Sequence, residues 1–157
     1  MTSPTDQSLT RGRYFEEFAV GFSAATAART ITETDVVNFA ALTGDWNPLH
    51  TDAEFAKTTV FGQRIAHGLL ILSIASGLIT RLGLIEGTAE AFRELSWKFR
   101  APVFIGDTIH ATATVSETRP LPRLGSGMVI LEVSVINQRG EVVQKGTWQA
   151  LVKSRPA

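Results

Sequence analysis

The sequence predicts an α+β fold in which an antiparallel sheet wraps around one long helix. Residues 68–82 are apolar at helical spacing, with leucines and isoleucines almost all the way round, which is typical of a helix buried on most sides. From residue 91 onward the period changes, and apolar residues alternate with polar ones as in strands with one buried face. One buried helix and a one-sided sheet together favour this architecture.

Length and composition exclude several classes of protein. The 157 residues, 44% hydrophobic and 19% charged, predict a single domain. Basic and acidic residues balance at 15 each, so we expect no nucleic-acid or anionic membrane partner. The absence of cysteine excludes disulfides, thiolate nucleophiles and cysteine-based zinc sites. The polar start of the chain lacks the apolar segment of a signal peptide, and no apolar run approaches the ~20 residues of a membrane span. A cytoplasmic, soluble protein is therefore expected.

Capping signals define the helices of the N-terminal half. Thr32 is a suitable N-cap for a helix, and Gly44 is a suitable stop. Thr51 and Glu54 have the spacing of a capping box, which predicts a second, short helix. The predicted order is a tail over 1–12 before a domain of 13–157, a strand over 21–31, helices over 33–42 and 51–56, a loop over 57–66 and the long helix over 68–82.

Alternation of apolar and polar residues predicts the strands of the C-terminal half. A short hairpin connection at Gln138–Gly140 joins the last two strands, while Pro102 and Gly106 mark an earlier turn. The alternating runs are Leu95–Phe99, Ile109–Val115, Val129–Val135 and Gly146–Val152.

The heptapeptide Gly44–His50 carries the strongest chemical signal. Asp45 and His50 are separated by a turn that Pro48 restricts, so a carboxylate and an imidazole can both reach one water molecule. At neutral pH this pair offers an anionic base and a mostly neutral imidazole, which suits proton transfer to and from bound water. The same residues also form ordinary turns, and for Asp45 and His50 alone a structural role is as well supported as a catalytic one.

A second candidate is Gly68, which opens the long helix. The N–H groups of a first helical turn have no intrahelical acceptor, and the helix dipole there favours developing negative charge. Gly68 could therefore bind an oxyanion, although it could also simply begin a helix.

The remaining polar residues are weaker candidates. Ser76 belongs to a stripe of small residues on the long helix, where a ligand chain or a neighbouring element could pack. Lys98, Arg100 and His110 are expected at the surface. No metal site is expected, because the three histidines are scattered and no acidic cluster accompanies them.

Four segments resemble the R-specific enoyl-CoA hydratases and MaoC-like dehydratases, and the similarity extends from about residue 15 to residue 153. The segments are Leu42–His50, Phe61–Gly62, Ile65–Leu70 and Phe99–Thr108. The resemblance implies a hotdog fold and a homodimer with an acyl-thioester tunnel at the subunit interface.

The resemblance also implies a role for each site residue. Asp45 and His50 match the catalytic pair, Asn47 a supporting polar residue, and Gly68 the position whose N–H binds the thioester oxygen. Trp46 falls at a variable position of the motif, where its bulk could narrow the pocket. Trp46 and His67 are expected to bind substrate together with Asn47, as is Ser76 of the small-residue stripe. No metal or separate cofactor is implied, since coenzyme A is part of the substrate.

These residues predict a hydro-lyase that interconverts a 2-enoyl-CoA and an (R)-3-hydroxyacyl-CoA. The first alternative is an acyl-CoA thioesterase of the same fold, which would direct water at the thioester carbonyl instead of C3. The second is a non-catalytic acyl-CoA-binding domain, which would tolerate replacement of Asp45 and His50.

Overall fold

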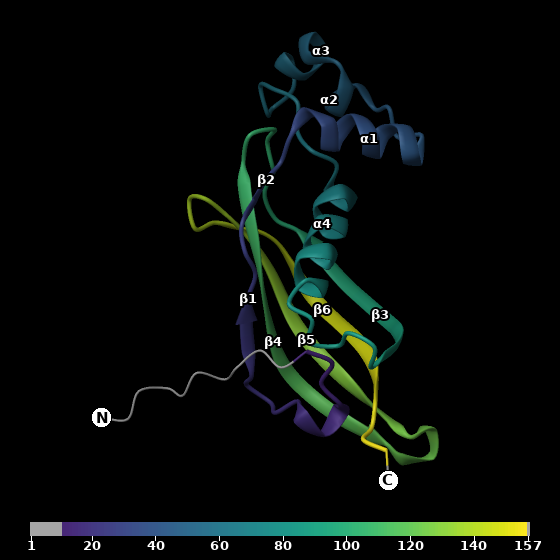
Figure 1. Ribbon diagram of the computed structural model, residues 1–157. Coiled ribbons are helices and arrows are strands. Elements are labelled where there is room, and N and C mark those ends of the chain that lie inside the picture. Colours follow the sequence, from purple (N-terminus) through teal and green to yellow (C-terminus); the bar gives the residue numbers. More distant parts are fainter. Residues whose placement is uncertain (1–10, 157) are drawn as a thin grey trace, which may run out of the picture.

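The structure, a computed structural model, describes residues 11–156 and shows one antiparallel sheet packed against the helix α4, Gly68–Thr80 (Figure 1). The strand order is β1-β4-β5-β6-β3, and β2 also pairs with β4. This confirms the predicted sheet around a central helix. The strands are β1 (Ser23–Ala25), β2 (Arg29–Thr30), β3 (Ala89–Phe99), β4 (Thr108–Leu121), β5 (Ser126–Asn137) and β6 (Val142–Lys153).

The core lies between α4 and the concave face of the sheet. Alternate residues of β4 are buried from Ile109 to Val115, as the sequence period predicts. Leu70, Ile71 and Ala75 of α4 pack into the same core, since each is at most 6% exposed. The hydrophobic effect on these two faces fixes the position of the helix start relative to β6 and β3.

The N-terminal half differs from its prediction at two places. The single strand expected over 21–31 is two short strands, β1 and β2, both paired with β4. The capping box expected at Thr51 is wrong, because Asp52 caps the following helix by accepting from the N–H groups of Glu54 and Phe55. The chain here forms two short helices, α2 (Pro48–Thr51) and α3 (Ala53–Lys57). Pro48 in the first turn of α2 presets a helical backbone, which places Thr51 inside a helix.

The other helix boundaries agree closely with the sequence. The helix α1 is Glu33–Thr43, with Thr32 as N-cap and Gly44 as a left-handed C-cap at φ 78°. The helix α4 ends at Thr80, two residues before the predicted end. Of the predicted tail over 1–12, residues 1–10 lie outside the described part. Gly12 donates its N–H to the Gly83 carbonyl at 2.8 Å, so the described chain is attached from this point.

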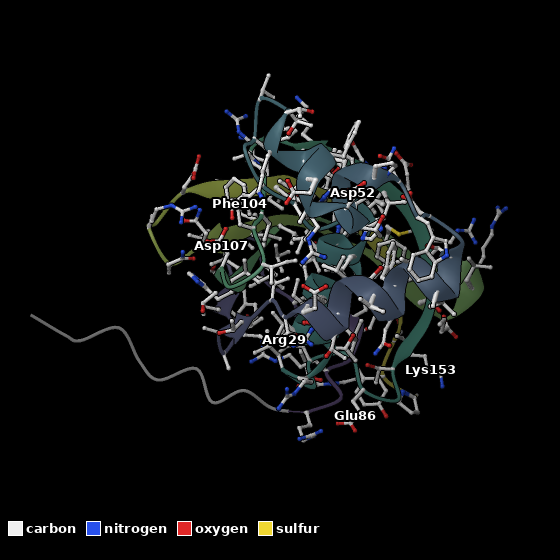
Figure 2. All side chains as sticks on the ribbon, turned by 90° about the horizontal axis from the view of Figure 1, so that it is seen from above. Arg29, Asp52, Glu86, Phe104, Asp107 and Lys153 are labelled. Atoms are coloured by element: carbon white, nitrogen blue, oxygen red, sulfur yellow. The ribbon has the colours of Figure 1, made fainter. Side chains whose placement is uncertain are left out.

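The three helices α1, α2 and α3 gather beyond the start of α4, at one end of the sheet (Figure 1). Beside them, Phe104 and Asp107 lie on one side of the molecule (Figure 2), where the Asp107 carboxylate accepts from the Phe104 N–H at 2.9 Å. That carboxylate is 5% exposed and also accepts from Gln138 at 2.7 Å. These bonds fix the turn that follows β3. No helix of the described residues is long and apolar enough to cross a membrane.

Candidate active site

The turn between α1 and α2 brings Asp45 and His50 to the same end of α4. Asn47 is the N-cap of α2, and its side-chain oxygen accepts from the Leu49 N–H at 3.0 Å. Asp45 accepts from the Asn47 N–H at 3.3 Å through one carboxylate oxygen. The turn-forming role of these residues is therefore real. It positions the Asp45 carboxylate and the His50 imidazole together.

The bonding of His50 fixes its tautomer. Its Nδ1 lies 2.7 Å from the Ile65 carbonyl oxygen, which can only accept, so Nδ1 carries the hydrogen. In the neutral ring, Nε2 then holds a lone pair and can accept a hydrogen bond. The Asp45 carboxylate and His50 Nε2 are therefore both acceptors.

His67 lies behind this pair and is 2% exposed. Its Nε2 donates to the backbone carbonyl of Asp45 at 2.9 Å, and its ring stacks on that of His50 with centroids 3.8 Å apart. Phe39 of α1 contacts the His67 ring, with centroids 5.0 Å apart. His67 therefore touches both members of the Asp45–His50 pair.

The three side chains form a cluster that the sequence did not reveal. One polar atom from each of Asp45, His50 and His67 lies within 4.8 Å of the others. We expected no metal site because the three histidines are scattered in the sequence. That reason is wrong, since His50 and His67 lie side by side in the structure and Asp45 is next to them. The His50 and His67 rings lie 30° from parallel.

Burial lowers the pKa of His50 below its ordinary value of 6.5. The hydrogen bond to the Ile65 carbonyl and the charge of Asp45 act in the opposite direction, while His67 adds to the lowering. The net effect favours the neutral ring at physiological pH. His50 Nε2 is therefore an acceptor under these conditions.

A cavity of about 450 Å³ connects His50 to the first turn of α4. Its wall includes His50, Gly68 and Phe99. A Cβ atom at Gly68 would lie 2.7 Å from the Phe99 ring, so this position has no room for a side chain. The N–H of Gly68 is in the first turn of a 13-residue helix, where backbone donors have no intrahelical partner.

Gln144 of β6 is a residue of this cavity that the sequence interpretation missed. It is 2% exposed, accepts from Trp97 Nε1 at 2.8 Å and donates from Nε2 to the Gly68 carbonyl at 3.0 Å. The signal was present in the strand period. Gln144 is two residues before Gly146 and four before Trp148, so it is on the same face of the strand as these predicted inward-facing residues. A polar side chain at such an inward position could have been noticed.

The structure brings some predicted site residues together and separates others. Asp45 is exposed beside His50, and neither it nor Asn47 is part of the cavity wall. Trp46 is 53% exposed and also lies outside that wall. Ser76 lies farther along α4, where it contributes to an inner cavity of about 90 Å³ and to a surface groove of about 390 Å³.

The chain is similar to known proteins over most of its length. The family described as MaoC like domain matches residues 18–136. An (R)-specific enoyl-CoA hydratase of Rhodospirillum rubrum is 39% identical over 143 residues, which cover 90% of this chain and 93% of that protein. A 3-hydroxybutyryl-CoA dehydratase of Methylorubrum extorquens is 41% identical over 108 residues, 68% of this chain and 66% of the relative.

Solved structures agree with this family. A structure from Archaeoglobus fulgius, described as a monoamine oxidase regulatory protein, is 43% identical with a TM-score of 0.88, covering 94% of this chain and 99% of that one. A Mycobacterium tuberculosis protein with a double hotdog fold is 20% identical with a TM-score of 0.81, covering 92% of this chain and 45% of that one, and shows the fold alone. The chain therefore belongs to the MaoC-like domain family, and it is a hotdog-fold lyase of the hydratase and dehydratase type.

Proposed function

We propose that this protein catalyses the reversible hydration of a 2-enoyl-CoA to an (R)-3-hydroxyacyl-CoA. The observation that carries the proposal is that two acceptors, the Asp45 carboxylate and His50 Nε2, lie close together next to a cavity whose wall includes the start of α4. A water molecule has two hydrogens to donate, one to each acceptor, which leaves an oxygen lone pair for C3 of the substrate. The similar (R)-specific hydratase supports the same substrate and stereochemistry.

The proposed reaction uses these groups in order. The water oxygen forms a bond to C3 while the C2–C3 π electrons move toward the thioester carbonyl, whose oxygen gains negative charge. Asp45 removes one proton from the water, and His50 orients the water through its other hydrogen. The Gly68 N–H stabilises the enolate oxygen. Return of a proton from the Asp45–His50 pair to C2 completes the product. No metal or separate cofactor takes part in this scheme.

The other predicted binding residues have subordinate roles in this proposal. Asn47 holds the turn through its cap on α2. Trp46 restricts the approach to the site from its exposed position, and His67 supports the reactive pair from behind. Ser76 contacts the acyl part of the substrate in the groove beside β3, where Phe92 and Leu95 offer apolar surface.

A combined absorbance and thiol assay with crotonyl-CoA tests the activity. Hydration removes the absorbance of the enoyl thioester without releasing thiol, and the product should have the R configuration at C3. Release of free coenzyme A would instead identify the thioesterase alternative. Tight binding of crotonyl-CoA with neither change would identify a non-catalytic binding domain. Product of S configuration would contradict the stereochemical part of the proposal.

We also propose that the chain forms a homodimer through β3. This strand is terminal in the sheet, and it exposes Phe92, Leu95 and Phe99 at 58%, 41% and 57%. The outer edge of β3 has no partner strand among residues 11–156, and an unpaired edge with exposed apolar side chains favours pairing with another strand. Light scattering should give twice the mass of one chain, and Leu95→Lys should shift the mass toward that of a monomer. A monomeric wild-type protein would contradict this proposal.

A further inference from the structure

We propose that Arg100 binds a phosphate group of coenzyme A at the mouth of the active-site cavity. This inference rests on the proposed function and deepens it, because it assigns a residue to the phosphate end of the substrate. Arg100 comes directly after β3 and is exposed, yet it belongs to the wall of the cavity that includes His50 and Gly68. An exposed residue of a cavity wall lies where the cavity opens to solvent.

A β-bulge gives Arg100 a different direction from its neighbours on β3. The N–H groups of Arg100 and Ala101 both donate to the carbonyl of Val143, at 2.8 Å and 3.1 Å. Two residues opposite one is the pattern of a bulge, which interrupts the alternation of side chains along a strand and can redirect one of them. Lys98, two residues earlier, contributes to a separate groove with Lys145, whereas Arg100 contributes to the active-site cavity. The bulge accounts for this separation.

Arg100 brings an unbalanced positive charge to this wall. Within residues 11–156, its guanidinium forms no ion pair, and the cavity wall contains neither Asp nor Glu. His50 is neutral at physiological pH because burial lowers its pKa below the ordinary value. Side chains such as Phe61 and Pro102 make most of the wall apolar. A guanidinium in such surroundings favours an anion, and its planar fork matches the oxygens of a phosphate.

The length of coenzyme A places its diphosphate within reach of Arg100. About 14 bonds separate the thioester carbon from the first phosphorus, so an extended pantetheine arm spans roughly 15–18 Å at about 1.25 Å per bond. A thioester at Gly68 starts beside the Phe99 ring, because a Cβ atom at Gly68 would lie 2.7 Å from that ring. Arg100 is the next residue, and its side chain extends about 7 Å beyond a Cα atom that is about 3.8 Å from that of Phe99. The arm can therefore cross the cavity and bring a phosphate to the guanidinium.

The test compares two thioesters that share the reacting group. Crotonyl-pantetheine has the same double bond and thioester as crotonyl-CoA but carries no phosphate. In Arg100→Gln, KM for crotonyl-CoA should rise roughly 3-fold to 30-fold with kcat nearly unchanged, because an exposed charged hydrogen bond is lost from the ground state and the transition state alike. The same variant should hydrate crotonyl-pantetheine with kcat/KM within about two-fold of wild type.

Lys98→Gln is the matched control. It removes one positive charge from the same strand, outside the cavity wall, so KM for crotonyl-CoA should stay within about two-fold of wild type. Added salt gives a second readout. The KM of wild type for crotonyl-CoA should rise with ionic strength, and this dependence should be weaker in Arg100→Gln.

Calorimetric binding of butyryl-CoA and butyryl-pantetheine separates this inference from the proposed reaction, because neither ligand has a double bond to hydrate. Arg100→Gln should weaken the binding of butyryl-CoA by the same factor as it raises KM, and it should leave butyryl-pantetheine unaffected. An equal effect on both ligands would overturn the inference. So would an unchanged affinity for butyryl-CoA, which is the result expected if Arg100 binds a carboxylate on the acyl group instead. Failure of the proposed function would appear separately, as wild type that hydrates neither crotonyl thioester.

Discussion

The two ends of α4 lie in opposite environments. At its N-terminal end, Gly68 shares a cavity with His50, and the exposed Asp45 lies next to that histidine. Toward its C-terminal end, Ser76 and Thr80 contribute to a small inner cavity whose other walls are apolar, with side chains such as Leu84 and Val152. One end therefore presents acceptors and free N–H groups, and the other presents hydrocarbon. We therefore expect substitutions at the first end to change turnover and substitutions at the second end to change stability.

The largest effect is expected from Asp45→Asn at the polar end. Loss of the base should reduce turnover by about 10²-fold to 10⁴-fold, because the amide cannot take a proton from water. The unfolding midpoint should change little, since Asp45 is exposed. Steady-state hydration of crotonyl-CoA and thermal unfolding measure the two effects.

Glu54→Gln is the matched control for that substitution. Glu54 is an exposed carboxylate of α3 that forms an ion pair with Lys57 on the same helix, so its removal should leave both rate and stability nearly unchanged. Near-normal turnover of Asp45→Asn would contradict the assignment of Asp45 as the base that removes a proton from water.

The opposite result is expected from Leu84→Ala at the apolar end. Leu84 is 9% exposed, and its truncation should lower the free energy of unfolding by about 2–5 kcal/mol through lost burial and an enlarged cavity. Turnover per folded molecule should stay close to wild type. Denaturant unfolding measures the change in stability, and the hydration rate divided by the concentration of folded protein measures turnover. A large fall in kcat of the folded variant would show that the two ends of α4 are coupled.

Gly68→Ala tests the close approach at the helix start. The added methyl group would lie 2.7 Å from the Phe99 ring and must displace it into the cavity. We expect kcat/KM to fall by roughly 10-fold to 10²-fold from misplaced substrate. The same substitution at Gly77, where a Cβ atom has open space, is the control. Equal activities of the two variants would argue against a substrate position at Gly68.

The smallest effect concerns pH. Protonation of His50 removes the lone pair at Nε2, so activity should fall on the acidic side. Because burial lowers the pKa of His50, the midpoint of this fall should lie below the ordinary histidine value of 6.5. Stability should change in the same direction as activity. Because the pKa of His50 is lower in the folded state than in the unfolded state, this group contributes stability above the unfolded pKa, and that stability is lost as the pH falls through the folded pKa. A kcat/KM profile with an acidic midpoint above 6.5 would contradict the assigned neutral ring.

The sequence predicted the regular parts of the fold well. The strand period of residues 109–115 reflects burial on one face, which leaves a local record in the chain. The helix α4 was expected to be buried on most sides, but in this chain its buried residues are Leu70, Ile71, Ala75 and Leu78, and Leu69 is 59% exposed. The error at Thr51 has a local cause as well. Pro48 and Asn47 start a helix earlier than the capping box suggested, and the neighbouring Asp52 caps the next one.

The candidate site was only partly predictable. Asp45 and His50 are five residues apart, so a turn was enough to suggest their meeting. His67 is distant from His50 in sequence, and its stacking depends on how α1 and α4 pack. Gln144 lies farther still, and only the folded sheet places its amide beside Gly68. Contacts of this kind depend on tertiary packing, which a short pattern does not record.

A structure of Asp45→Asn with bound crotonyl-CoA would locate the attacking water, since the slowed variant should retain intact substrate. We predict one water molecule within hydrogen-bonding distance of both residue 45 and His50 Nε2, facing C3, with the thioester oxygen at the Gly68 N–H. Substrate bound with its carbonyl away from Gly68, or with C3 out of reach of any water held by His50, would contradict the proposed mechanism.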